Sequence, residues 1–148
     1  MKISELIAEI AMCIPAVSSG KVFIANDVKP GFEVDTEGTY LKAIVRRLLE
    51  TAVLHSSGSP IKIWAKQFHN LTVLHFKYKD DRPEVELQKM VAHLEPFAER
   101  MGGCLYLTSH LPNDISIAFT FLTSLKNISG SPYSQMLALP ENQKRLSA

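Results

Sequence analysis

The residues of this sequence that could do chemistry are few and widely separated. Asp80 and Asp81 follow an alternating apolar run, where a carboxylate could accept hydrogen bonds, although a solvated turn and a helix cap are the simpler interpretation. Arg46 and Arg47 could bind phosphate or line a solvated helix face. The five histidines are scattered, and a metal site would require several of them to converge with a carboxylate. Nucleophile-elbow, zinc-protease and Walker-type segments do not occur in the sequence.

Composition limits the classes of function. The chain has 148 residues, enough for one compact domain, and its 46% hydrophobic and 21% charged content is ordinary for a globular protein. A net charge of +1 argues against a nucleic-acid binder that depends on neutralising phosphates. We find no membrane segment and no secretory leader, so the expected location is cytoplasmic. Cys13 and Cys104 lack the spacing of a metal or redox motif, and we expect buried, reduced thiols.

The elements that must position these residues are organised around one long helix, expected over residues 37–56. Its apolar residues recur as pairs four positions apart, which at about 100° per residue places them on one face. Asp35 or Thr36 could cap its first turn, and Gly58 and Pro60 end it. The apolar face comprises Tyr40, Leu41, Ile44, Val45, Leu48, Leu49, Ala52 and Val53.

The remaining patterns predict a helical layer and a sheet. Ahead of the long helix we expect a short helix capped by Ser4, then strands over 22–25 and 32–34 that pair with each other. After it we expect, in order, a hairpin of strands 61–68 and 71–78, a helix starting at Asp81 and Pro83 that kinks or restarts at Pro96, and a hairpin of strands 104–108 and 115–122.

This order of elements predicts an α+β fold, a two-layer α/β sandwich whose mostly antiparallel sheet is covered on one face by helices. We assign residues 1–125 to this domain. Residues 126–148 turn to Ser, Gly, Pro and Gln with scattered apolar side chains, and we expect a C-terminal tail or docking segment there.

Four segments, in the same order along the chain, resemble conserved parts of one family. Residues 34–35 and 40–45 resemble the entry into its first conserved helix, and residues 47–56 resemble its N-box, usually N-L-L-x-N-A-x-K-x-S/T. Residues 97–109 resemble its helix, Gly-Gly turn and strand after the nucleotide lid, and 117–121 fits its closing strand. The family is the ATP-binding domain of sensor histidine kinases, the GHKL or Bergerat-fold ATPases. The resemblance covers about residues 3–122 and implies the Bergerat fold.

The resemblance also implies where a nucleotide would be held, and here the sequence departs from the family. An N-box asparagine of the family binds the magnesium that bridges the ATP phosphates, a role suited to a hard oxygen ligand. That position is Thr51, the earlier asparagine position is Arg47, and the lysine position is Leu54. Threonine could still offer an oxygen, but leucine cannot hold a phosphate.

The family's first glycine box, D-x-G-x-G, uses its aspartate to accept from the adenine amino group. Asp80 occupies that position, but Asp81-Arg82-Pro83 follows without either glycine. No glycine lies between residues 58 and 102, so the glycine-rich lid that would cradle phosphates is also lacking. The resemblance therefore implies the scaffold without the usual cofactor.

We therefore predict a degenerate, pseudokinase-like ATPase domain that acts in two-component-like signalling through protein contacts. Thr51 and Asp80 are its vestigial cofactor-binding positions, and we expect no catalytic residue, no metal and no cofactor. The expected partner is a response regulator or a kinase dimerisation domain, not nucleic acid, and homodimer formation is left open. Enzymatic activity is also left open, with inactivity as the expectation.

Two alternatives remain open at this point. In the first, a divergent ATPase binds ATP and magnesium, with Thr51 and Asp80 replacing the lost ligands. In the second, a histidine phosphotransfer protein carries a degenerate ATPase-like domain. His93, in the run His-Leu-Glu-Pro, resembles a kinase phosphoacceptor. The family's acceptor lies on a separate helix ahead of the ATPase domain, so a surface histidine of a helix is the simpler interpretation.

Overall fold

The computed structural model describes residues 1–36, 38–56, 58–111 and 113–124, with only the backbone for 110 and 111. The predicted domain limit at 125 and the tail over 126–148 lie outside these residues. The described elements are α1 (Ile3–Met12), α2 (Pro15–Ser18), β1 (Ile24–Asn26), α3 (Gly38–His55), β2 (Ile61–Phe68), β3 (Leu71–Lys79), α4 (Glu84–Arg100), β4 (Cys104–Leu111) and β5 (Asp114–Leu122).

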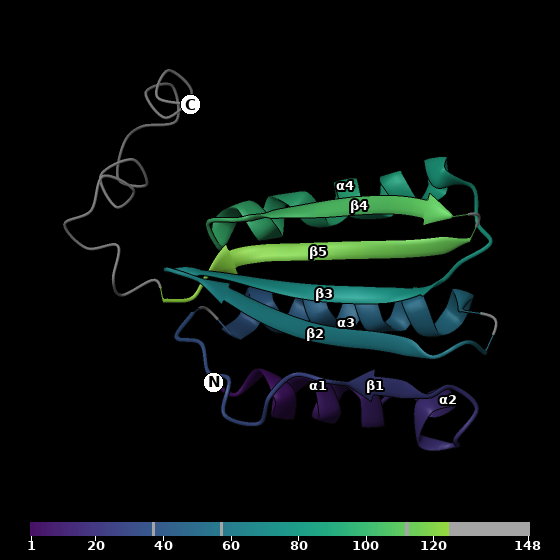
Figure 1. Ribbon diagram of the computed structural model, residues 1–148, viewed down its shortest axis with the longest axis horizontal. Coiled ribbons are helices and arrows are strands. Elements are labelled where there is room, and N and C mark those ends of the chain that lie inside the picture. Colours follow the sequence, from purple (N-terminus) through teal and green to yellow (C-terminus); the bar gives the residue numbers. More distant parts are fainter. Residues whose placement is uncertain (37, 57, 112, 125–148) are drawn as a thin grey trace.

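The strands form one five-stranded sheet in the order β1-β2-β3-β5-β4, and α1, α3 and α4 all lie on the same face of it (Figure 1). Only β1 and β2 are parallel; every other neighbouring pair is antiparallel. The predicted α+β sandwich, with a mostly antiparallel sheet covered on one face by helices, is confirmed.

The long helix α3 lies at the centre of the helical layer, as its apolar periodicity predicts. It packs beside α1 and α4, and one continuous core joins these helices to the inner face of the sheet. Six side chains of α3 are buried in this core: Leu41, Ile44, Val45, Leu48, Leu49 and Ala52.

Both predicted hairpins are present. The connection between β2 and β3 at His69 and Asn70 is tight, and His69 adopts a positive φ of 54° there. Alternation along β3 buries Thr72, Leu74, Phe76 and Tyr78 under the helices and leaves the residues between them on the other face. Because the side-chain period of a strand is two, this alternation fixes which groups meet the helical layer.

The Gly102–Gly103 turn joins α4 to β4 and depends on both glycines. Gly102 has a φ of 74°, a conformation that residues with a Cβ rarely adopt. A Cβ added to Gly103 would overlap the backbone carbonyl group of Thr120 on β5. The two glycines therefore let the chain turn sharply and bring β4 against β5.

Several local predictions are wrong. The segments 22–25 and 32–34 do not pair with each other: β1 pairs in parallel with β2, and Glu33 forms an isolated bridge with Lys2. The parallel pairing follows from the α3 crossover, which returns the chain in the same direction. Cys13 and Cys104 are both exposed, because Cys13 follows the end of α1 and Cys104 lies on the outward face of an edge strand.

The helix boundaries also differ from the predicted ones. In α1 the N-cap position is Lys2 rather than Ser4, and no side chain caps the helix. In α4 the first helical residue is Glu84, with Pro83 at the N-cap position, so Asp81 lies outside the helix. The helix continues through Pro96, so the restart expected there is wrong, while the kink expected as its alternative stays a prediction.

Candidate functional site

The face of α3 that meets α4 is identified by Tyr40. Its hydroxyl accepts a hydrogen bond of 2.7 Å from Nη1 of Arg100, whose guanidinium lies 5.6 Å from the tyrosine ring centre. The ring also contacts Phe97 of α4, at 6.1 Å between centroids. At about 100° per residue, the N-box positions Arg47, Thr51 and Leu54 return to within about 40° of Tyr40 around the helix. These three side chains therefore lie on the α4 side of α3, where the resemblance expects phosphates.

The groups offered along this α3–α4 side are poor ligands for a triphosphate. Arg47 is exposed and Thr51 is half-buried. Leu54, at the position of the family's lysine, is 76% exposed and does not fill a cleft. Of the three, only Arg47 could attract a phosphate, and its exposure leaves it well solvated.

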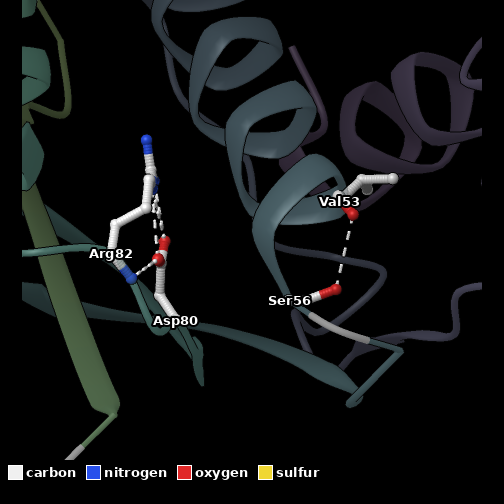
Figure 2. A network of polar contacts seen from close by, with 4 residues as sticks. All are labelled: Val53, Ser56, Asp80 and Arg82. Atoms are coloured by element: carbon white, nitrogen blue, oxygen red, sulfur yellow. Dashed lines mark hydrogen bonds and ion pairs between the residues drawn. The ribbon is translucent and has the colours of Figure 1, made fainter.

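The acid of the first glycine box is held in an ion pair. Asp80 follows the end of β3 and is only 2% exposed. Its carboxylate accepts hydrogen bonds from the amide of Arg82 at 2.9 Å, from Nε at 3.1 Å and from Nη2 at 2.7 Å (Figure 2). Burial raises the pKa of the Asp80 carboxyl, but the hydrogen bonds and charge of Arg82 outweigh it and hold that pKa below its usual value.

A buried phenol lies beside this ion pair. Tyr78 is 3% exposed, and its hydroxyl has no hydrogen bond of ordinary geometry in the described part of the chain. Burial, and then the negative charge of Asp80, raise the pKa of Tyr78 well above its usual range. The phenol therefore stays neutral and adds no charge to the site.

A cavity of about 280 Å³ opens at the end of the sheet next to this ion pair. Such a volume is just below the range of about 300–1,000 Å³ typical of small-molecule sites. Its hydroxyl groups are engaged. Ser59 donates to the carbonyl of Ser56 at 2.7 Å, and Ser56 donates to the carbonyl of Val53 at 3.4 Å (Figure 2). The lining residues are Ser56, Ser59, Lys79, Asp80, Asp81 and Asn113.

The two predicted site residues, Thr51 and Asp80, lie at different elements. Thr51 lies on α3 facing α4, whereas Asp80 lies at the end of β3, and within the described residues no hydrogen bond joins them. The residue that sequence reasoning missed is Arg82. Its signal was present, because an arginine at the first glycine position of the box lies two residues from the aspartate, close enough to pair with it.

Comparisons with known proteins bear on the fold. No protein-family model and no characterised protein sequence matches the chain. The Acinetobacter baumannii histidine kinase AdeS superimposes with a TM-score of 0.71 at 11% identity, over 83% of this chain and 66% of that one. The catalytic domain of histidine kinase ThkA gives 0.70 at 13% identity, over 84% of this chain and 95% of that domain. The chain has the fold of a histidine kinase catalytic domain.

Two further structures with this histidine kinase fold were determined as complexes. Full-length ShkA in complex with AMPPNP gives a TM-score of 0.69 at 15% identity, over 84% of this chain and 31% of ShkA. ThkA in complex with the response regulator TrrA gives 0.69 at 14% identity, over 84% of this chain and 41% of that kinase chain. The chain thus spans the catalytic-domain portion of much longer proteins. In its own described part, no helix is long and apolar enough to cross a membrane.

Proposed function

We propose that this chain is a degenerate domain of the histidine kinase fold that does not bind ATP and acts in two-component-like signalling through protein contacts. The observation that carries the proposal is the ion pair of Asp80 with Arg82. In the family this aspartate accepts from the adenine amino group, and here both of its carboxylate oxygens accept from Arg82.

The energies involved favour the ion pair over adenine. A hydrogen bond to a charged group contributes about 1.5–3 kcal/mol. Removing one partner from a buried ion pair costs about 3–5 kcal/mol. Adenine would have to displace Arg82 from a carboxylate that is almost completely buried, so the exchange is unfavourable by itself.

The phosphate end offers nothing to offset this cost. Leu54 has no charge with which to hold a phosphate, and Thr51 replaces the magnesium-binding asparagine. No glycine lies between residues 58 and 102, where a lid would present its backbone amides to the phosphates. We infer that both ends of the nucleotide site have been lost.

The proposed partners are proteins of the two-component class. ThkA forms a complex with the response regulator TrrA, which supports a response regulator as one partner of this chain. A kinase dimerisation domain is the other, since catalytic domains of this fold form part of longer kinases such as ShkA. We place this module in the cytoplasm, where such partners work.

Isothermal titration calorimetry with magnesium-ATP, magnesium-ADP and AMPPNP tests the proposal. We expect no binding tighter than about 100 μM, which corresponds to roughly −5.5 kcal/mol. The variant R82G removes the ion pair and serves as a comparison; it should not bind either, because the lid and the phosphate ligands are still missing. Tight binding to the natural chain would establish the alternative, a divergent ATPase in which Thr51 and Asp80 act as ligands.

A further inference from the structure

The face of the sheet opposite the helices is left uncovered by them (Figure 1). Strand register brings outward side chains of four strands into rows across this face. One row runs from Trp64 on β2 to His75 on β3, then to Ala118 on β5 and Tyr106 on β4. A second row joins Lys62, Lys77, Ser116 and Thr108. We refer to these two rows, together with Lys66, as the open face.

The charges of the open face are uncompensated. Lys62, Lys66 and Lys77 are exposed, and within the described chain none of them forms an ion pair. Lys62 lies directly opposite Lys77, and like charges at such positions destabilise a sheet. Several acids lie instead on the helices, as Glu50, Glu84, Glu86, Glu95 and Glu99. Asp114 of β5 lies on the outward face of the sheet, but it is opposite Lys79 and not opposite any of these three lysines.

The centre of the open face is aromatic. The ring of Trp64 stacks on that of His75, with 4.9 Å between centroids and 9° between planes, and the ammonium of Lys62 lies 5.7 Å from the tryptophan ring centre. Tyr106 is 68% exposed. Burial, and then the charge of Lys66, lower the pKa of His75, so at neutral pH the positive charge comes from the lysines. Tryptophan and tyrosine are among the residues enriched in interaction hot spots.

We propose that the open face binds an acidic segment of a partner protein, with carboxylates beside Lys62, Lys66 and Lys77 and an apolar side chain against Trp64. At about 3.3 Å per residue, Lys62 and Lys66 lie about 13 Å apart along β2 on either side of Trp64. This spacing suits a segment in which two acidic groups flank an apolar residue. The inference rests on the proposed function, because it names the surface through which a module of protein contacts would act.

Other occupants fit the open face less well. Residues 126–148 contain Lys126, Lys144 and Arg145 but only one acid, Glu141, so they would be repelled by the lysines. Binding of a single-stranded nucleic acid depends on neutralisation of its phosphates. The net charge of the chain is only +1. Charge complementarity therefore selects an acidic protein segment.

Selection of random peptides displayed on phage against the full chain tests this proposal. We expect enriched peptides to combine acidic residues with an apolar residue. Synthetic versions of these peptides should lose affinity by about tenfold or more for the variant K62E/K77E, since two attractive contacts become repulsive. The matched control K42E/K89E changes the same net charge on exposed helical positions and should bind as the natural chain does.

The results of these experiments distinguish an acidic protein segment from the other candidate ligands of the open face. Peptides without an acidic excess, or equal binding by K62E/K77E, would overturn the proposal. Binding of oligothymidine, or of vesicles containing phosphatidylserine, in the absence of acidic peptides would assign the open face to nucleic acid or membrane instead. If K62E/K77E does not fold, as judged by circular dichroism, W64A provides the second test and should weaken the same peptides. Titration with nucleotides tests only the proposed loss of ATP binding on the helical face, whereas the peptide experiments test only the open face. Each proposal can therefore fail without the other.

Discussion

At two places where the histidine kinase family has glycines, this chain differs: it has the glycines at one and lacks them at the other. At the turn between α4 and β4 it has Gly102 and Gly103, as the resemblance expects. Two residues after Asp80, where the family has the first glycine of its D-x-G-x-G box, it has Arg82. The first position is crowded by the backbone of Thr120, whereas the second is filled by a guanidinium that pairs with a buried acid.

The difference separates what the fold requires from what a nucleotide requires. Gly103 is needed because two backbones approach each other, whether or not a ligand is present. A glycine at position 82 would be needed only for a ring to approach the backbone. If the domain binds no nucleotide, as we propose, a side chain can occupy that space. Under the proposed function, the chain keeps the glycines that build the scaffold and has a side chain where nucleotide binding would require a glycine.

The largest expected effect is that of G103A. The new methyl group would overlap the backbone of Thr120, which cannot move without disturbing the pairing of β4 with β5. We expect a loss of about 3 kcal/mol or more in the free energy of unfolding, measured by urea denaturation. G31A is the matched control, because a Cβ at Gly31 meets nothing within 4 Å. If G103A is as stable as the natural chain, the claim that the fold itself requires Gly103 is wrong.

The next effect is that of R82A, which leaves a buried carboxylate without its partner. We expect destabilisation of about 3 kcal/mol near neutral pH. In the natural chain the pKa of Asp80 is lowered by Arg82, so the contribution of the pair is present above the ordinary carboxyl pKa and is lost as pH falls through the lowered value.

In R82A the sign reverses. Burial without the arginine raises the pKa of Asp80, so the folded state binds the proton more strongly than the unfolded state does. The destabilisation relative to the natural chain should therefore be smaller at about pH 5 than at about pH 7. Denaturation at both pH values measures this, with R46A as a control on an exposed arginine. A pH-independent difference would mean that Asp80 is not the affected group.

The sequence predicted the fold well where the signal was local. The period of α3 was sufficient to place its buried face, and the strand patterns were sufficient to predict both hairpins. The partner of β1 could not be predicted in this way, because its parallel pairing joins Ile24 to Ile61 across the whole of α3. Cys104 was assigned to the core by residue type, although its alternation with buried Leu105 already indicated the outward face.

The candidate site was predictable only in part. Position in a motif identified Asp80 as a candidate, and the expectation from the missing glycines, that no cofactor binds, stays a prediction. The pairing of Asp80 with Arg82 depends on the turn after β3, which no periodicity describes.

Two charge pairs on the outward face of the sheet allow a smaller test. K77E places a carboxylate opposite Lys62 and should raise the free energy of unfolding by about 0.2–1 kcal/mol, because a repulsive cross-strand pair becomes attractive. K79E is the opposite case: Lys79 lies opposite Asp114, so this change should lower stability by a similar amount. Both effects should shrink at high salt. If both substitutions change stability equally, the residue directly opposite each lysine does not determine its electrostatic contribution.

The smallest expected effect is that of L54K, which restores the lysine of the family's N-box. Leu54 is 76% exposed, so the change should alter stability by no more than about 0.5 kcal/mol. It should also leave magnesium-ATP unbound in calorimetry. One lysine supplies a single solvated charge, while Arg82 still occupies Asp80 and no lid amides are available. T51N is the matched substitution at the magnesium position, with the same expectation. ATP binding by L54K alone would mean that the nucleotide site lacks only one phosphate ligand. The difference between the preserved Gly102–Gly103 turn and the altered nucleotide site would then come down to one missing positive charge.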